Sequence, residues 1–245
     1  MTKTMKANLI FNPKGNDEVA NRTIIKWNTT WLFQLNLTKY SWAKSLYQVM
    51  IWNFWVPEKV SGLWDDAVQF KEALTEDERR AYKWILSFLI FLDSIQTVNL
   101  PNFNDYITAP EVNLILSIQA YQEAIHSQSY ATMLETIVAS HERDEIYYFW
   151  RTDKHLLERN EFIGWIYQDF IDDPSDENYF RGIIWNFLLE SIYFYNGFAF
   201  FDTLADQGKM VATDRMINFI RRDELTHVTI FANLIKEIKK EFTEM

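Results

Sequence analysis

The sequence predicts an all-α protein in which long helices pack as a bundle, and three observations support this. From about residue 75 onward, apolar residues recur at the three- and four-residue spacing of one helix face. The boundaries of these stretches carry helix-capping residues rather than the turn residues of β-hairpins. The links between them are short, and five long helices joined by short links favour a bundle.

The first long helix is predicted over residues 76–99. Thr75 and Glu78 have the spacing of a capping box, in which the threonine hydroxyl accepts the amide hydrogen of Glu78 and the glutamate reaches back. Pro101 is expected to stop this helix, because proline disfavours helical geometry at the residue before it.

The second long helix is predicted to begin with another capping box, formed by Thr108 and Glu111. Pro110 falls in its first turn, where the missing amide hydrogen has no helical partner in any case. This helix is expected to run to about Ala139.

Three more helices follow. The third is predicted over residues 142–171, and residues 172–175 are expected to cap a fourth that ends near Gly208. Thr213 is expected to cap a fifth helix running towards Phe242.

The first 60 residues are less regular. Residues 40–54 look helical and aromatic, and residues 55–58 break that pattern. Without a repeat, a low-complexity tract or an interdomain linker, we expect residues 1–245 to form a single domain, with residues 1–60 as an irregular segment packed on the bundle.

Composition and charge exclude several functions. The net charge of −10 argues against a nucleic-acid partner, because nucleic-acid-binding surfaces are basic. The absence of cysteine excludes disulfides, zinc fingers, iron–sulfur clusters and thiol catalysis on this chain, and no Gly-x-Gly loop is present to bind nucleotide phosphates. No apolar run reaches the roughly 18 residues of a membrane span and no signal peptide is recognisable, so we expect a cytoplasmic protein with no membrane partner.

Two of the four histidines stand in the same local pattern. Glu123 precedes His126 by three residues, and Glu224 precedes His227 by three residues. Residues three apart on a helix share a face, so each pair can present one oxygen and one imidazole nitrogen to the same point. A single Glu-x-x-His pair is more often a surface pair or a core histidine, so the motif needs independent support.

That support comes from two carboxylates in very apolar helical stretches. Asp93 interrupts the run from Ile90 to Ile95, and Glu190 lies among leucine, isoleucine and phenylalanine. Burying a lone carboxylate costs several kcal/mol, and neither stretch offers an obvious basic partner, so a cation is expected.

Together these residues match the ligand pattern of a dinuclear metal site in a bundle core, with one carboxylate from each of two helices and a Glu-x-x-His from each of two others. Two divalent ions would balance four carboxylates and two neutral imidazoles. Oxygen and nitrogen ligands without sulfur suit iron or manganese. The predicted metal ligands are Asp93, Glu123, His126, Glu190, Glu224 and His227.

Several motifs resemble those of one family, the radical-generating small (β) subunit of class I ribonucleotide reductase. The resemblance runs from about Asn28 onward and rests on the segments 53–58 (NFWVPE), 92–96 (LDSIQ), 123–130 (EAIHSQSY), 189–194 (LESIYF) and 222–227 (RDELTH). It implies a ferritin-like bundle that binds two iron and/or manganese ions per chain through the six ligands named above.

The resemblance also implies roles for aromatic residues. Tyr130 matches the tyrosine that the oxygen-activated centre oxidises to a stable radical, and Phe194 and Phe198 resemble its apolar shell, although core packing alone would also explain these two phenylalanines. Trp55 and Asp223, together with the ligand His126, match the relay that passes the radical to a separate large catalytic subunit. Holding a ligand histidine in place is an equally good role for Asp223.

The expected function is that of a ribonucleoside-diphosphate reductase small subunit, an oxidoreductase that makes deoxyribonucleotides with its large subunit. The resemblance further implies a homodimer and allows a flavoprotein activator. One departure is expected: the chain ends at Met245, soon after His227, without the family's last helices and docking tail. A truncated sequence, a separate chain carrying the remainder and a partial copy would each explain this.

Three alternatives stay open. A related di-metal oxidase acting on a small organic or lipid ligand would share the metal ligands but would need a long apolar channel. A metal-storage bundle would bind more than two ions per chain. A metal-free helical interaction protein would bind none.

Overall fold

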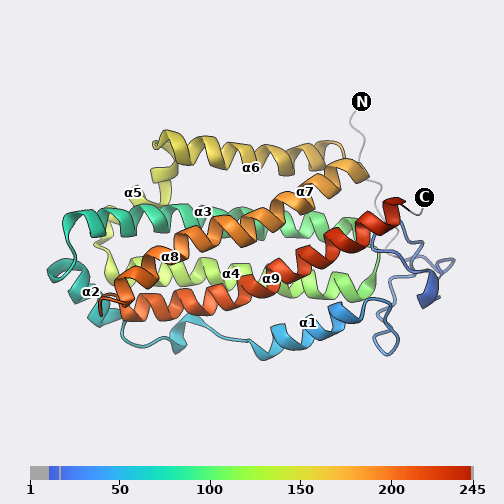
Figure 1. Ribbon diagram of the computed structural model, residues 1–245, viewed down its shortest axis with the longest axis horizontal. Helices are drawn as coiled ribbons and strands as arrows, with labels where there is room; N and C mark the ends of the chain where they lie inside the picture. The colour runs from blue at the N-terminus through green and yellow to red at the C-terminus, as the bar shows by residue number, and fades with distance from the viewer. Residues whose placement is uncertain (1–10, 17, 244–245) are drawn as a thin grey trace.

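The computed structural model describes residues 11–16 and 18–243, and it confirms the predicted all-α class. Apart from one isolated bridge between Ile25 and Ile107, every regular element in the described residues is helical. Figure 1 shows the arrangement of the α-helices, which are α1 (Ser41–Trp52), α2 (Leu63–Glu72), α3 (Glu76–Tyr106), α4 (Pro110–Ile137), α5 (Ser140–Tyr148), α6 (Lys154–Asp172), α7 (Asp176–Leu188), α8 (Phe194–Ala205) and α9 (Val211–Thr243).

The bundle core consists of α3, α4, α9 and the α7–α8 pair, which all run along the long axis of the molecule (Figure 1). Helix α3 packs along α4, and α9 contacts both α7 and α8. Helix α1 covers α4 and α9 from one side, whereas α6 packs on α7 and α3 from the other. Because four helices turn one face inward, a single buried core runs through the bundle.

Helix α3 begins as predicted and ends later. The capping box between Thr75 and Glu78 is present in both directions, which confirms that prediction. The expected stop before Pro101 is wrong, because the helix continues to Tyr106. Pro101 is solvent-exposed, so its missing amide hydrogen leaves no buried group unpaired. The following turn buries Phe103 against α6 and α7, and this packing favours the continued helix.

Helix α4 begins at the expected place without the expected capping box. Its N-cap residue is Ala109, with no side-chain cap, although proline does occupy the first turn. The Glu111 carboxylate instead forms a buried ion pair with Arg22 at 2.6 Å and accepts the amide hydrogen of Lys39 at 3.0 Å. The Glu111 side chain therefore bonds to the N-terminal segment and does not form the predicted capping box with Thr108. The helix ends at Ile137, close to the predicted end.

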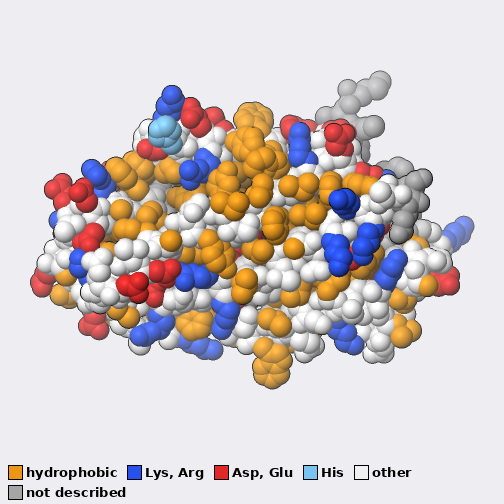
Figure 2. Space-filling model, in the orientation of Figure 1, with side chains coloured by type: hydrophobic (Ala, Val, Ile, Leu, Met, Phe, Trp, Pro, Cys, Tyr) orange, Lys and Arg blue, Asp and Glu red, His pale blue; other side chains and the backbone are white. Residues whose placement is uncertain are grey.

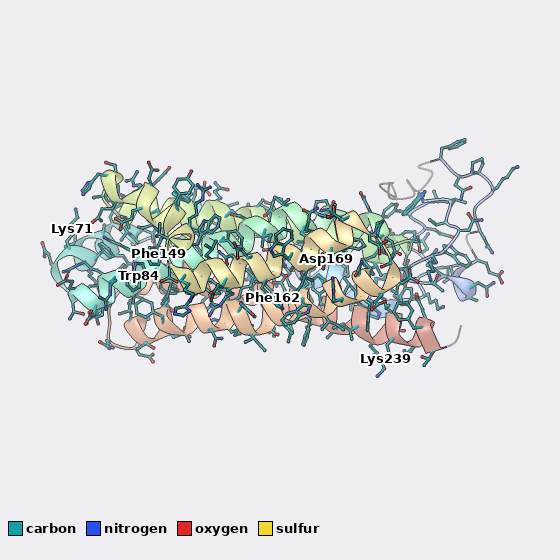
Figure 3. The ribbon with its side chains drawn as sticks, turned by 90° about the horizontal axis from the view of Figure 1, so that it is seen from above. Lys71, Trp84, Phe149, Phe162, Asp169 and Lys239 are labelled. Carbon is teal, nitrogen blue, oxygen red and sulfur yellow. The ribbon has the colours of Figure 1, made fainter. Side chains whose placement is uncertain are left out.

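The predicted helix over residues 142–171 is two helices, α5 and α6, separated by a short 3-10 turn over Phe149–Arg151. This break lets Phe149 stack on Trp84 of α3 at 4.9 Å between ring centroids, and Figure 3 labels both residues at one end of the molecule. Asp153 then caps α6 by accepting the amide hydrogen of Leu156. Stacking between these aromatic rings and the new cap at Asp153 thus override the continuous local periodicity.

Of the caps predicted for the fourth and fifth helices, one is confirmed and one is wrong. Ser175 caps α7 as the sequence suggested, by accepting the amide hydrogen of Asn178. Thr213 is not the cap of α9, which starts at Val211. The carboxylate of Asp66 from α2 accepts the amide hydrogens of Ala212 and Thr213 at 3.3 and 2.6 Å. Asp66, which is distant in sequence, therefore caps α9 in place of Thr213.

Helix α3 is long and apolar enough to cross a membrane by length and composition, and half of its most apolar window is buried within the bundle. Core helices of water-soluble proteins pass the same test, so the pattern carries little weight. Figure 2 shows hydrophobic side chains over α6 and α7 as well. Phe162 and Trp165 of α6 are both exposed.

Candidate metal centre

The six predicted ligands come from four helical segments and meet in the middle of the bundle. Helix α3 supplies one carboxylate, α4 and α9 each supply a glutamate and a histidine, and the turn between α7 and α8 supplies the last glutamate. All six side chains are fully buried: Asp93, Glu123, His126, Glu190, Glu224 and His227.

The first group of ligand atoms surrounds the Nδ1 atom of His126. This atom lies 3.1 Å from Asp93 Oδ1, 3.0 Å from Glu224 Oε1 and 3.5 Å from Glu123 Oε2. One ligand atom from each of the four residues lies within 4.8 Å of the others, which is compact enough for one ion.

The second group surrounds the Nδ1 atom of His227. Glu224 Oε2 lies 2.8 Å from it, Glu123 Oε1 3.2 Å and Glu190 Oε2 3.7 Å. Glu123 and Glu224 therefore belong to both groups, each turning one oxygen to either histidine. The structure brings all six side chains into two adjoining four-residue clusters that share two carboxylates.

The donor atoms of this centre fit metal ions. A carboxylate oxygen on each of Asp93, Glu123, Glu190 and Glu224 is buried and lacks a hydrogen-bond partner among the described residues. Buried polar atoms are almost always paired, so four oxygens without such a partner at one site fit the binding of cations. Iron and manganese both accept this set of oxygen and imidazole ligands.

Electrostatics leads to the same conclusion. Burial raises the pKa of Asp93 and of Glu190 well above the usual range, and the charges of neighbouring glutamates raise it further. Burial would lower the pKa of His126, but its hydrogen bonds to Asp223 and Asp93 outweigh this and raise it well above normal. These raised pKa values show that the buried negative charges need a positive counter-charge, either protons or, as the donor set allows, divalent cations.

A π-helical turn over Leu189–Tyr193 joins α7 to α8 and carries Glu190. A π turn adds a residue to the helical turn and re-aims the side chains around it, and such turns are frequent at functional sites. The sequence predicted one continuous helix here, because a single π turn leaves no periodicity signal over a long helical stretch.

A buried hydrogen-bonded chain leads outward from His126. Its Nε2 atom lies 3.2 Å from Asp223 Oδ2, and the same oxygen accepts the indole hydrogen of Trp55 at 2.7 Å. Trp55 is itself buried, at 4% exposure, and it lines a pocket. The residues that the sequence assigned to a relay are thus connected to one another.

A corresponding contact at His227 was missed by the sequence analysis. The Nε2 atom of His227 lies 3.0 Å from Gln122 Oε1. Gln122 precedes the predicted ligand Glu123, and only its position beside that residue could have drawn attention to it. Together with Trp55 and Asp223 it lines a pocket of about 240 Å³ between α1, α4 and α9.

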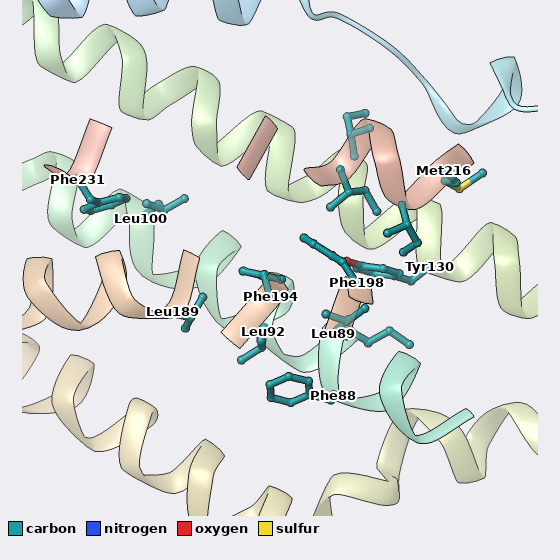
Figure 4. Close-up of a cluster of buried hydrophobic side chains, with 14 of the residues drawn as sticks. Phe88, Leu89, Leu92, Leu100, Tyr130, Leu189, Phe194, Phe198, Met216 and Phe231 are labelled. Carbon is teal, nitrogen blue, oxygen red and sulfur yellow. The ribbon is translucent and has the colours of Figure 1, made fainter. Parts of the chain in front are cut away.

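Tyr130 lies one helical turn after His126 on α4 and is fully buried. Figure 4 shows it in the same apolar cluster as Phe194 and Phe198, whose rings stack at 5.8 Å. Its hydroxyl has no hydrogen-bond partner among the described residues. Burial, together with the charges of Asp93 and Glu224, raises the pKa of Tyr130 well above 10, so the phenol keeps its proton.

Comparisons with known proteins agree with this geometry. Residues 32–245 match the family model described as ribonucleotide reductase, small chain. The chain is 48% identical over 232 residues to the ribonucleoside-diphosphate reductase subunit beta of Treponema pallidum, covering 95% of this chain and 66% of that protein. It is 47% identical over 238 residues to the subunit of the same name from Aquifex aeolicus, covering 97% of this chain and 34% of that protein.

A solved structure is similar over nearly the whole chain. The ribonucleotide reductase R2 subunit from Clostridium botulinum superposes with a TM-score of 0.93 and 49% identity, covering 99% of this chain and 75% of that one. The chain thus spans only about a third to two thirds of the two curated relatives above. The family match covers most of the sequence and includes every residue of the metal centre, so the chain belongs to the ribonucleotide reductase small-chain family.

Proposed function

We propose that this chain is the radical-generating small subunit of a ribonucleoside-diphosphate reductase, an oxidoreductase that supplies deoxyribonucleotides. The observation that carries the proposal is the pair of buried four-residue clusters that share Glu123 and Glu224, with Tyr130 one turn from His126. Two iron and/or manganese ions held there would supply oxygen activation and one-electron oxidation.

The protein's own part begins with holding and shielding the centre. The six ligands would fix both ions, with Glu123 and Glu224 contributing to each. The stacked rings of Phe194 and Phe198 belong to the apolar cluster that contains Tyr130 and help to keep water out. A tyrosyl radical lasts only where water and reductants are excluded, and this cluster provides such a place.

Oxidation of Tyr130 removes one electron and releases the proton of its hydroxyl group. Asp93 is the carboxylate that we assign to take that proton, because it is the carboxylate whose charge acts most strongly on the phenol. The raised pKa of Tyr130 keeps the proton on oxygen until the electron leaves, so the two losses are coupled.

The stored oxidising equivalent must then leave the chain, since no cysteine is present to reduce a ribonucleotide. The hydrogen-bonded chain His126–Asp223–Trp55 provides the route, with Trp55 nearest the surface. The receiving partner is a separate, cysteine-bearing large catalytic subunit. We further propose a cytoplasmic homodimer, with a flavoprotein activator where manganese is used.

The test is reconstitution of the purified chain with iron(II) and oxygen, or with manganese(II) and a reduced oxygen species. We expect two ions per chain and a tyrosyl radical detected by electron paramagnetic resonance. Tyr130→Phe should abolish the radical while two ions still bind. The matched control is Tyr82→Phe, which changes another fully buried tyrosine of the bundle and should leave the radical intact.

Three results would contradict the proposal. An unchanged radical in Tyr130→Phe would show that another residue carries it. Binding of many more than two ions per chain would favour metal storage instead. If the chain binds no metal, the alternative of a metal-free helical interaction protein would be favoured.

A further inference from the structure

Glu190 is held differently from the other carboxylates of the centre. Its Oε1 atom accepts N–H groups from three side-chain amides: Gln96 at 2.5 Å, Gln119 at 2.9 Å and Asn186 at 3.1 Å. These donors come from α3, α4 and α7. Its Oε2 atom accepts no hydrogen bond and faces Nδ1 of His227 at 3.7 Å. Oε1 of Glu190 is therefore held by three hydrogen bonds, while Oε2 is available to bind an ion.

A buried tyrosine orients two of those amides. The Tyr167 hydroxyl on α6 lies 3.1 Å from Gln96 Oε1 and 2.8 Å from Asn186 Oδ1, and its single hydrogen is shared between these two oxygens. An amide whose oxygen faces Tyr167 must turn its NH₂ group towards Glu190. The reversed orientation would bring amide and carboxylate oxygens together at hydrogen-bond distance, which is repulsive.

The carboxylate at the other end of the centre has no such support. Asp93 Oδ1 is 3.1 Å from the ligand atom Nδ1 of His126, and Oδ2 has no hydrogen-bond partner. No side-chain amide among the described residues donates to either oxygen of Asp93. The two terminal carboxylates, Asp93 and Glu190, therefore differ in how firmly their positions are fixed before any ion arrives.

We infer that Tyr167, Gln96, Gln119 and Asn186 form a positioning unit that presents Oε2 of Glu190 to the ion bound with His227. The inference rests on the proposed function and deepens it, because it assigns positioning residues to one of the two ions. Partners behind a ligand typically contribute 10–100-fold to metal affinity. Gln119 also donates to Oε1 of Glu123 at 3.4 Å, and that oxygen faces His227 as well. Since the unit contacts carboxylate oxygens only on the His227 side, its loss weakens one ion selectively.

Tyr167→Phe is the sharpest variant, because it removes one hydroxyl and leaves all six ligands in place. Tyr179→Phe is its matched control. Both tyrosines are at most 3% exposed, and both rings meet Phe103 edge-on, at 5.5 and 5.8 Å between centroids. The Tyr179 hydroxyl donates to the backbone oxygen of Phe103 instead of to an amide of the positioning unit.

The measurement is a titration of the metal-free full chain with manganese(II) chloride without oxygen, following free manganese by its paramagnetic resonance signal. We expect two ions to bind the unaltered protein. In Tyr167→Phe one ion should bind about tenfold or more weakly, and the other should keep its affinity. Tyr179→Phe should bind both ions as the unaltered protein does.

Equal affinities in Tyr167→Phe and the unaltered protein would overturn the inference, as would equal weakening of both ions or the same loss in Tyr179→Phe. If Tyr167→Phe fails to fold, Gln96→Met decides the question, because it removes one donor to Glu190 and leaves the tyrosine ring packed on Phe103. Failure of the unaltered protein to bind two ions would overturn the proposed metal centre itself. The failures of the two proposals are thus distinguishable.

Discussion

The two Glu-x-x-His pairs share a local motif but differ in what surrounds them. In both, Nδ1 of the histidine faces the ligand cluster. The Nε2 atom of His126 meets the carboxylate of Asp223 at 3.2 Å, whereas the Nε2 atom of His227 meets the neutral amide oxygen of Gln122 at 3.0 Å. One helical turn further on, the first pair is followed by Tyr130 and the second by Phe231, both fully buried.

The comparison shows that the Glu-x-x-His motif supplies the clustered carboxylates and imidazoles, whereas the residues around each pair determine the function that its side of the centre is suited to. Beside the first pair lie the oxidisable phenol of Tyr130 and Asp223, which is hydrogen-bonded to Trp55. This side is suited to storing a radical and transferring it out of the chain. On the second pair's side lie a phenylalanine and a neutral amide, while the positioning unit holds Glu190. That side is suited to holding an ion in place.

The largest expected effect is on the number of ions bound, and it should differ between a predicted ligand that belongs to both clusters and one that belongs to a single cluster. Glu224→Ala should abolish binding of both ions, because each four-residue cluster contains Glu224. Asp93→Ala should leave one ion bound, since Asp93 belongs only to the cluster around His126. Elemental analysis after equilibration and desalting measures this as ions per chain. Equal losses in the two variants would contradict the division into two clusters.

The next effect concerns the apolar surroundings of the two pairs. Phe198→Ala and Phe231→Ala each remove a fully buried ring and should each cost about 3–5 kcal/mol of unfolding free energy, measured with urea. Only Phe198→Ala is expected to shorten the lifetime of the radical, because Phe231 lies across the cluster, far from Tyr130, in Figure 4, so its removal admits no water next to the phenol. Equal radical lifetimes in the two variants would refute this difference.

Asp223→Asn should have a smaller effect on the first pair. Hydrogen bonds to a charged group contribute about 1.5–3 kcal/mol, so the ion bound with His126 should lose about ten- to a hundredfold in affinity. Transfer to the large subunit should fall as well, because Asp223 also accepts the indole hydrogen of Trp55. Metal titration and turnover with the partner measure the two losses. Normal turnover in this variant would remove Asp223 from the relay.

Gln122→Met should have the smallest effect. A neutral hydrogen bond contributes about 0.5–1.5 kcal/mol, so the ion bound with His227 should lose about tenfold or less in affinity. Gln128→Met on the same helix is the control, because its amide bonds to Glu58 in an exposed position. A larger loss in Gln122→Met than in Asp223→Asn would reverse the contrast between neutral and charged partners.

Much of the fold and of the candidate centre could be predicted from the sequence. Helical periodicity gave the all-α class, and the i, i+3 spacing placed each glutamate beside its histidine, because both features are local. Asp93 and Glu190 stood out since a carboxylate in an apolar helix needs a partner. The structure brings these six side chains together, while their role as ligands stays a prediction.

Other features depend on residues that are distant in sequence. Gln119 meets Glu190 across 71 residues, and Trp55 meets Asp223 across 168. Local spacing holds no information about which amide oxygen will face Tyr167. The same reason explains why the capping box at Thr108 and the cap at Thr213 were wrongly predicted, since tertiary partners took over those roles.

The sequence by itself determined the all-α class and the residue types that the long helices offer, because hydrogen bonding and side-chain spacing within a helix are set locally. It did not indicate α2, nor the breaks that divide α5 from α6 and α7 from α8. Only the tertiary structure decided that Pro101 lies inside a helix, that a π turn carries Glu190, and that Asp223 and Gln122 stand behind the two histidines. These outcomes depend on packing between helices. There, burial of apolar surface and satisfaction of buried polar groups outweigh local preference.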